Sequence, residues 1–173
     1  MKTIEIYGEN RFDEWTKTRN CCRGIVIKDN SILLSYETKE NTWMIPGGGV
    51  EENESLEECC IREVQEETGY ITSLSPCVLK IVEYYEEWKF VSYYYICNIV
   101  GKTERKLTKR EQMVGMEPRF ISIDEAIEIF SKHNDYKESD EMKRGLYERE
   151  YKALCDIVKL LKKERLIYKN KRK

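Results

Sequence analysis

The sequence predicts an α/β fold in which a mixed β-sheet lies between helices. Short apolar or alternating segments recur through the first two thirds of the 173 residues, as expected of strands. One segment with helical periodicity interrupts these strands, and two more follow the last one. Strands on both sides of a helix, followed by further helices, are typical of an α/β sandwich. We also expect a long C-terminal helix.

The strands are expected in short runs that end at turn residues. They cover residues 3–7, 22–28, 32–36, 43–45, 78–86, 89–100 and 119–121. Asp29, Asn30 and Ser31 form a turn signal, so the second and third runs should make a hairpin. Residues 101–118 are expected to be a long polar loop, and a loop of that length is usually functional or mobile.

Three helices are expected. The first begins after Ser55, because Ser55 and Glu58 form a capping box, and it ends at Gly69. The second covers residues 124–132, where Ser122 and Glu125 form another such box. The third covers residues 140–165.

The composition fits one domain over residues 1–173. The 30 Lys and Arg residues nearly balance the 32 Asp and Glu residues, giving a net charge of −2. That balance argues against a protein devoted to nucleic-acid binding, which is normally strongly basic. The seven cysteines form no C-x-x-C pair, so we expect buried free thiols. We expect no membrane span and a cytoplasmic location, because no apolar run approaches about 20 residues.

The last residues form a basic C-terminal tail, residues 159–173. This tail could recruit RNA or a membrane surface. The simpler interpretation is a helix end whose cations complement the helix dipole.

The chemically informative feature is a glutamate-rich helix that follows three glycines. Glu63, Glu66 and Glu67 have the spacing that places three carboxylates on one helix face. These like charges repel, and the helix dipole disfavours them near the C-terminal end. Magnesium or manganese ions prefer carboxylate and carbonyl oxygens and would compensate them. The alternative is a solvated acidic face without function.

Residues 48–70 fit the pattern G-x5-E-x7-R-E-U-x-E-E-x-G-U, where U is a bulky aliphatic residue. The single departure is Tyr70. Residues 43–48 add a W-x-x-P-G-G sequence directly before it. This segment resembles the Nudix hydrolase family, and the resemblance extends over residues 22–129.

The resemblance implies an α/β/α sandwich and metal-dependent cleavage of the diphosphate linkage in a small nucleotide-like substrate. The Gly48 carbonyl and Glu63, Glu66 and Glu67 would bind Mg²⁺ or Mn²⁺. Arg62 would orient these glutamates, and Glu54 would brace the loop. The family often pairs, so a homodimer is a possible assembly.

The general base and the substrate contacts remain open at this point. Glu111 is the first downstream candidate for the base and Glu117 the second, although a glutamate of residues 48–70 could serve instead. Arg23, Tyr85 and Glu117 are candidates for substrate contact. For Tyr85, which belongs to an aromatic segment, ordinary sheet packing is the competing interpretation.

Two rival functions also remain. The chain could be a catalytically weak module that binds a nucleotide for regulation. It could instead process the 5′ end of RNA, with the basic tail as a recruiting element.

Overall fold

A computed structural model describes residues 1–170 of the chain, with side chains described as far as residue 163. Most of the predicted basic tail, residues 159–173, therefore lies outside the described side chains. The chain divides into two compact units, Met1–Ala126 and Ile127–Lys173, and each unit is described by itself. The single domain expected over residues 1–173 stays a prediction.

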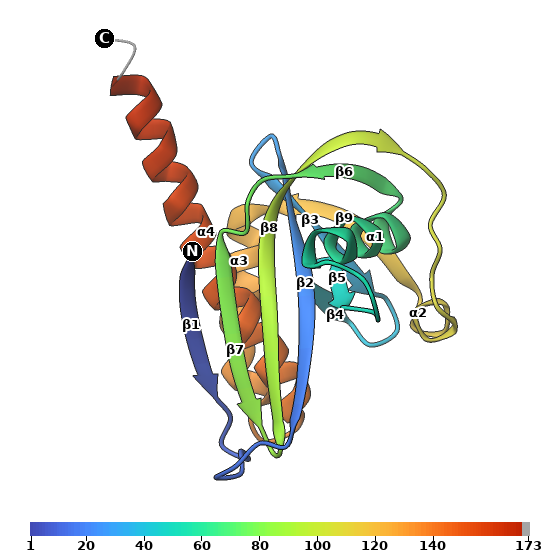
Figure 1. Ribbon diagram of the computed structural model, residues 1–173, viewed down its shortest axis with the longest axis vertical. Helices are drawn as coiled ribbons and strands as arrows, with labels where there is room; N and C mark the ends of the chain where they lie inside the picture. Colours follow the sequence, from blue (N-terminus) through green and yellow to red (C-terminus); the bar gives the residue numbers. More distant parts are fainter. Residues whose placement is uncertain (171–173) are drawn as a thin grey trace. The chain divides into compact units, whose positions relative to one another are not determined.

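The first unit contains a mixed β-sheet whose central strands run in order β1-β7-β8-β2-β3-β4 (Figure 1). Strands β1 and β7 are parallel, as are β2 and β8, while the other pairs are antiparallel. In addition, β5 pairs with β2, β6 with β8 and β9 with β3. The strands are β1 (Lys2–Tyr7), β2 (Lys17–Lys28), β3 (Ser31–Glu37), β4 (Thr42–Met44), β5 (Gly47–Gly49), β6 (Tyr70–Leu74), β7 (Leu79–Tyr85), β8 (Trp88–Lys102) and β9 (Met116–Ser122). The predicted mixed sheet is confirmed.

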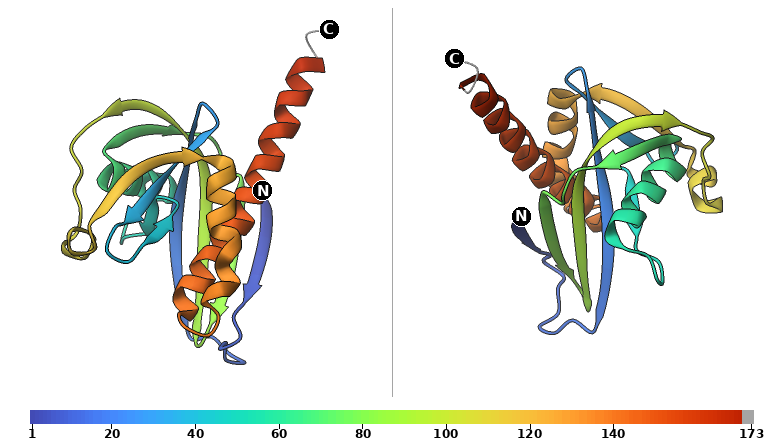
Figure 2. Two further views of the ribbon diagram at one scale, coloured as in Figure 1. Left: turned by 180° about the vertical axis from the view of Figure 1, so that it is seen from behind. Right: turned by 45° about the horizontal axis from the view of Figure 1, so that its top comes forward.

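Helix α1 (Leu56–Thr68) begins and ends where the sequence predicts. Ser55 and Glu58 form the predicted capping box, and Gly69 caps the C-terminal end in the left-handed conformation. The helix packs on β2, β5 and β6, on one face of the sheet (Figures 1 and 2). Tyr70, the departure from the family pattern, begins β6 and packs edge-on against Phe120 of β9, with 5.9 Å between ring centroids.

The second unit is helical. It contains most of α3 (Ile123–Ser131), the 3₁₀ helix η1 (Lys132–Tyr136) and α4 (Glu141–Asn170). Tyr147 of α4 packs edge-on against Phe130 and Tyr136 at 5.3 and 5.4 Å between ring centroids. The predicted long C-terminal helix is confirmed. Within the described residues, no helix combines the length and the apolar character needed to cross a membrane.

Two expectations about the first unit were wrong. Residues 101–118 are not one loop, because β8 continues to Lys102, a short helix α2 (Lys109–Val114) follows, and β9 starts at Met116. Thr108 and Glu111 form a capping box that starts α2. Strand β2 begins at Lys17 rather than residue 22, because its polar first residues pair in parallel with β8. Tertiary pairing here outweighs the polar composition.

The core between α1 and the sheet is rich in cysteine. Its buried residues are Cys22, Val26, Leu33, Cys59, Cys60, Val64, Tyr95 and Cys97. All seven cysteines are free thiols, and five of them are buried, as predicted. The pKa values of Cys22 and Cys60 are raised, first by hydrogen bonds with Cys59 and Cys97 and then by burial, so these thiols stay protonated.

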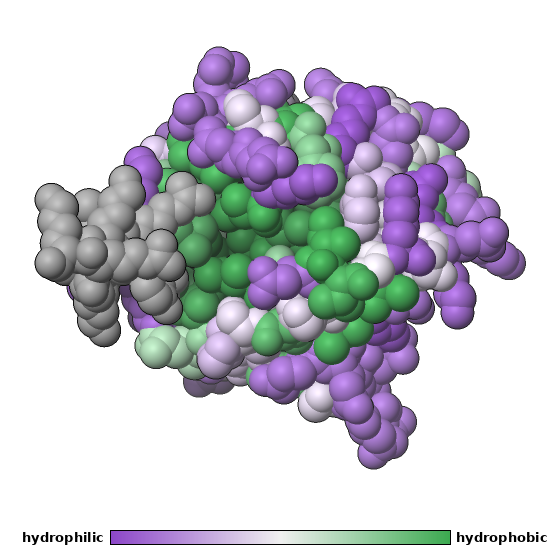
Figure 3. Space-filling view, turned by 90° about the horizontal axis from the view of Figure 1, so that it is seen from above, coloured by the Kyte–Doolittle hydropathy of each residue, from purple (hydrophilic) through white to green (hydrophobic). Residues whose placement is uncertain are grey.

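Some hydrophobic surface remains on the outside. Figure 3 shows a patch of hydrophobic residues surrounded by hydrophilic ones on the side of the molecule seen from above. Strand β8 ends on this side of the sheet (Figure 1), and its residues Ile99 and Val100 are exposed. Small exposed apolar areas are normal, and the predicted homodimer is not tested by them.

Gly24 of β2 sets how closely α1 approaches the sheet. A methyl group at Gly24 would collide with the Val64 side chain and lie 3.1 Å from the Cys97 sulfur. We expect Gly24→Ala to destabilise the protein by about 1–3 kcal/mol, because overpacking a dense core forces side chains out of place. Urea denaturation measures this loss. Gly101→Ala is the control, since its added methyl group comes no closer than 3.3 Å to another atom, the Cδ1 atom of Ile71. Equal stability of both variants would contradict the prediction.

Candidate active site

The glycine strand and the glutamate helix meet at the edge of the sheet. Strand β5 pairs with β2, with Gly48 opposite Cys22 and Gly49 opposite Cys21. A side chain at Gly48 would collide with the carboxylate of Glu63 on α1. Only glycine lets the backbone come this close to the carboxylate.

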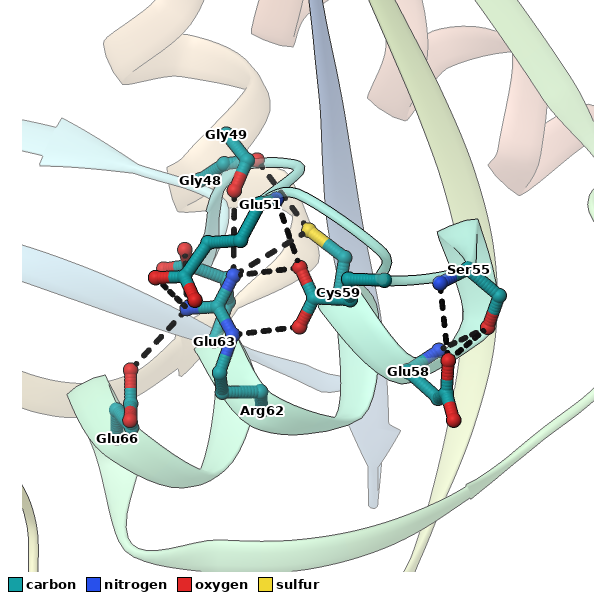
Figure 4. A network of polar contacts seen from close by, with 10 residues as sticks. Gly48, Gly49, Glu51, Ser55, Glu58, Cys59, Arg62, Glu63 and Glu66 are labelled. Atoms are coloured by element: carbon teal, nitrogen blue, oxygen red, sulfur yellow. Dashed lines mark hydrogen bonds and ion pairs between the residues drawn. The ribbon is translucent and has the colours of Figure 1, made fainter.

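Arg62 is the centre of a polar network that joins α1 to the preceding loop (Figure 4). Its Nε and Nη2 atoms donate to the two oxygens of Glu54 at 2.6 and 2.9 Å. Its Nη1 atom donates to Glu63 Oε1 at 2.8 Å and to Glu66 Oε2 at 3.2 Å. Nη2 also donates to the Gly49 carbonyl at 3.2 Å. One guanidinium therefore orients three carboxylates and the glycine strand.

The pair of Glu54 and Arg62 stays ionised at neutral pH. Hydrogen bonding to Arg62 is the main reason that the pKa of Glu54 falls to about 2, and the same contact raises the pKa of Arg62. Burial raises the pKa of Glu63, although Arg62 opposes this effect. Glu54 is consequently the permanent counter-charge of Arg62.

Glu67, the last of the three carboxylates on α1, is nearly out of reach of water, with 4% of its surface exposed. Its Oε2 atom accepts a hydrogen bond from the Ser35 hydroxyl of β3 at 2.5 Å. Burial raises its pKa to about 8, against the smaller opposing effects of Ser35 and Arg23. Without a cation beside it, Glu67 is therefore mainly protonated at neutral pH.

Arg23 of β2 is a buried cation in the same site, with 9% of its surface exposed. Its Nη1 atom donates to the carbonyls of Gly47 and Ile45 at 2.7 and 3.3 Å. Burial raises the pKa values of Glu63 and Glu67, and the charge of Arg23 partly opposes this rise. Within the described part of the chain its Nε atom is buried and has no hydrogen-bond partner.

Three contributors to the site were not predicted. Ser35 binds Glu67, and Glu37 of β3 binds Arg110 of α2 at 2.7 Å. The Cys59 thiol donates to the Gly48 carbonyl at 3.7 Å and accepts from Arg62 at 3.8 Å. Polar residues at inward positions of β3 were the available signal for the first two, since such residues are buried only with a partner.

Two other predicted site residues, Glu111 and Glu117, have hydrogen-bond partners outside the Arg62 network. Glu111 lies on α2, where its Oε2 atom accepts from the backbone nitrogen of Thr108 at 2.7 Å, and its charge contributes to the raised pKa of Glu67. Glu117 of β9 accepts a hydrogen bond from Arg119 at 2.6 Å.

The structure does not bring Tyr85 to the site. It lies at the last position of β7, opposite Trp88 at the turn into β8, and its ring is close to Gly8. Gly49 pairs with Cys21, which is four residues along β2 from Lys17, the residue that pairs with Trp88. The predicted contact of Tyr85 with substrate gains no support from the fold and stays a prediction.

The oxygen donors at the site suit a hard divalent cation. Within the described residues, no three His, Cys, Asp or Glu side chains converge as a finished ion site, because Arg62 holds Glu63 and Glu66 while Ser35 holds Glu67. The Gly48 carbonyl has only a weak thiol donor, and Glu63 lies against Gly48. Carboxylates and a carbonyl are the ligands that Mg²⁺ and Mn²⁺ prefer, so the predicted set Gly48, Glu63, Glu66 and Glu67 fits such an ion.

A groove of about 670 Å³ borders the C-terminal end of α1 rather than Gly48 itself. Thr68 of α1 lines it, together with Lys102, Arg105, Gln112 and Glu117. Thr68 directly follows Glu67 in the sequence, so the groove borders the end of the helix that contains the three carboxylates, although none of these lines it.

The chain has clear relatives among known proteins. The NUDIX domain family matches residues 19–144. The RNA pyrophosphohydrolase of Sphingopyxis alaskensis is 25% identical over 122 residues, which cover 67% of this chain and 72% of that protein. A relative from Caenorhabditis elegans, described as a nudix hydrolase, is 38% identical over 82 residues, but these are 44% of this chain and only 22% of that protein. A NUDIX hydrolase structure from Nitrosomonas europaea has a TM-score of 0.52 at 23% identity, covering 63% of this chain and 75% of that one.

The fold, the glycine strand and the glutamate helix thus define a hydrolase that acts on acid anhydrides. The chain belongs to the Nudix hydrolase family.

The raised pKa of Glu67 has a consequence for stability. Folding raises this pKa from 4.5 to about 8, so the folded state binds the proton more tightly and its stability falls as the pH rises between these values. We therefore compare the free energies of unfolding of the wild type and Glu67→Gln with a chelator present. As the pH rises from 4.5 to about 8, the wild type should lose stability relative to the variant. A difference that does not change with pH would contradict a protonated Glu67.

Proposed function

We propose that the chain is a metal-dependent pyrophosphohydrolase, which cleaves the diphosphate linkage of a nucleoside triphosphate or another nucleoside diphosphate derivative. The observation that carries this proposal is the Arg62 network, which binds Glu63 and Glu66, places Glu63 against Gly48 and lies on the same helix as the buried Glu67. Aligned acidic side chains would repel an anionic substrate unless a cation lies between them.

Each residue of the set has a distinct role in this proposal. Gly48 through its carbonyl and Glu63, Glu66 and Glu67 would hold Mg²⁺ or Mn²⁺. When bound, such an ion offsets the charge of the phosphates and lowers the pKa of a coordinated water. Arg62 keeps Glu63 and Glu66 aligned. Glu67 gives up its proton when the cation arrives, because the added charge favours the carboxylate.

The phosphate end of the substrate needs donors as well as cations. Arg23 is suited to this role, because its buried Nε–H has no partner within the described residues, and an unpaired buried donor is costly. The groove beside α1 has space for the part of the substrate beyond the phosphates.

Relatives differ in their named substrates, and phosphoric anhydride is what these substrates share. They include RNA pyrophosphohydrolases, a described 8-oxo-dGTP diphosphatase of Bacillus subtilis and a diphosphoinositol polyphosphate phosphohydrolase of Mus musculus. The scissile linkage is therefore better supported than the identity of the attached group.

Glu111 is the favoured general base. Its charge is the smallest of the contributions to the raised pKa of Glu67, of which burial is the largest. Glu117 is bound by Arg119, and Glu63 and Glu66 are bound by Arg62, while Glu67 has the role of a metal ligand in this proposal. Glu111 lies outside the Arg62 network. One of its oxygens accepts from the Thr108 backbone nitrogen, and a carboxylate has a second oxygen that can accept a proton from water.

The second candidate is processing of RNA 5′ ends. It is favoured by the relatives named RNA pyrophosphohydrolase, of which two cover 67% and 66% of this chain. The net charge of −2 argues against extended RNA binding. A purely regulatory nucleotide-binding module is less favoured, because such a module does not need all the proposed ion ligands. The homodimer and the cytoplasmic location stay predictions.

A substrate panel separates these candidates. Nucleoside triphosphates, nucleoside diphosphate derivatives and a 5′-triphosphorylated oligonucleotide are each incubated with Mg²⁺ or Mn²⁺, and released phosphate and pyrophosphate are measured. Turnover of the mononucleotides supports the first candidate, whereas turnover of the oligonucleotide alone supports the second. No turnover of any compound would reject both.

Glu67→Gln tests the proposed ion ligands. We expect turnover to fall by about 10²-fold or more with saturating Mg²⁺, because a neutral amide binds a hard cation poorly. The fold should survive, since glutamine can still accept the Ser35 hydrogen bond and the protonated wild-type carboxyl is also neutral. Full turnover in this variant would remove Glu67 from the ligand set.

Glu111→Gln tests the general base. We expect kcat to fall by about 10²-fold while KM changes little, because the carboxylate acts on the attacking water and not on the bound substrate. Steady-state kinetics over a pH range measure both values. Unchanged kinetics would transfer the role to Glu117 or to a glutamate of α1.

A further inference from the structure

Apart from its capping box, helix α2 has few internal contacts that fix its position. It has six residues, Lys109–Val114, and none of them is buried. A helix this short is unstable alone, because too few hydrogen bonds offset the cost of starting it. Its position must therefore come from contacts with neighbouring elements.

Those contacts come from the end of β3 and the turn into β4. Arg110 Nη1 donates to Glu37 Oε1 at 2.7 Å. Lys39 Nζ donates to the Met113 carbonyl at 2.6 Å, and Thr38 Oγ1 donates to the Gly115 carbonyl at 3.1 Å. Both of these carbonyls lie at the C-terminal end of α2, whereas Glu37 binds Arg110, the residue directly before Glu111.

The burial of Glu37 is unusual for a surface ion pair. The side chain of Glu37 is 3% exposed, whereas that of Arg110 is 69% exposed. Removing a carboxylate from water costs several kcal/mol, and a partner in solvent returns little of it. Stability therefore does not explain this pair, and a geometric role does.

Strand β3 connects this pair to the proposed catalytic centre. Ser35 and Glu37 are two residues apart, so their side chains are on the same side of the strand. Ser35 binds Glu67, and Glu37 binds Arg110, the neighbour of Glu111. One side of β3 thus holds a proposed metal ligand and the helix that contains the proposed base.

We propose that Glu37 is a positioning residue for the hydrolysis. Its buried carboxylate holds Arg110 and so sets α2 at the distance from Glu67 that lets Glu111 accept the proton of the attacking water. This inference rests on the proposed function, because it takes Glu111 as the base.

Arg110 could instead contact a substrate phosphate directly, and the kinetics distinguish the two roles. Loss of a phosphate contact weakens substrate binding and raises KM. Loss of positioning lowers kcat, because the base is misplaced while the substrate still binds.

The experiment compares Glu37→Gln, Arg110→Ala and the double variant. For each protein, kcat and KM are measured on the best substrate of the panel, and hydrogen–deuterium exchange is measured over residues 109–115. Arg110→Ala reports the same contact from its exposed side, in case Glu37→Gln unfolds. The control is Glu87→Gln, which breaks the exposed pair between Lys17 and Glu87 at the other end of β8.

We expect each single variant to lower kcat by about 10-fold and to leave KM within about 2-fold. Exchange over α2 should rise in both variants and not in Glu87→Gln. The double variant should be no worse than either single one, because both remove the same contact. Arg110→Lys should recover part of kcat, since it can still donate to Glu37.

Three results would overturn the positioning role. They are an unchanged kcat in Glu37→Gln with Glu111→Gln impaired, unchanged exchange over α2, and a raised KM confined to Arg110→Ala. If the wild type hydrolyses no compound, the proposed function itself fails and the positioning role falls with it. An active wild type with an unaffected Glu37→Gln contradicts only the positioning role.

Discussion

The site depends on one cation that is shared among three acidic side chains. Arg62 binds Glu54, Glu63 and Glu66, and it also donates to the Gly49 carbonyl. Without it, Glu63 and Glu66 would repel each other across one helical turn at the end where the helix dipole is also unfavourable. The guanidinium has five donors in a fixed plane, so it can meet several partners at once where a lysine could not. The close approach of α1 to the glycine strand follows from this contact.

Two further carboxylates are buried at a cost that stability alone does not justify. Glu67 of α1 and Glu37 of β3 are 4% and 2% exposed. Glu67 accepts a hydrogen bond from Ser35, and Glu37 accepts one from Arg110. A buried acid is destabilising unless it is neutral or well paired. Glu67 meets this condition by remaining protonated until a cation arrives, whereas the largely exposed Arg110 offsets only part of the cost of burying Glu37. In both cases burial lowers the stability of the fold but fixes the position of a carboxylate at the site.

The part of the site on α1 could be predicted because helical geometry alone fixes it. Arg62, Glu63, Glu66 and Glu67 have the same relative positions in any α-helix, and the capping box at Ser55 sets where that helix starts. Contacts between distant segments could not be predicted in this way. Ser35 meets Glu67 only because β3 lies beside α1 in the folded chain. The polar sequence of α2 has no apolar stripe and therefore predicts a loop, and polar contacts hold the helix in the folded chain.

Glu54, rather than Glu63, determines where Arg62 stays. Both of its oxygens bind Arg62, and its pKa of about 2 keeps it charged over the whole physiological range. Glu63 and Glu66 each give Arg62 a single oxygen, and a carboxylate has a second oxygen with which to bind a cation. Because Glu54 holds the guanidinium, a cation can take up those second oxygens without drawing Arg62 away from its place. A loop glutamate eight residues before the arginine therefore lets one helix face serve an arginine and a metal ion together.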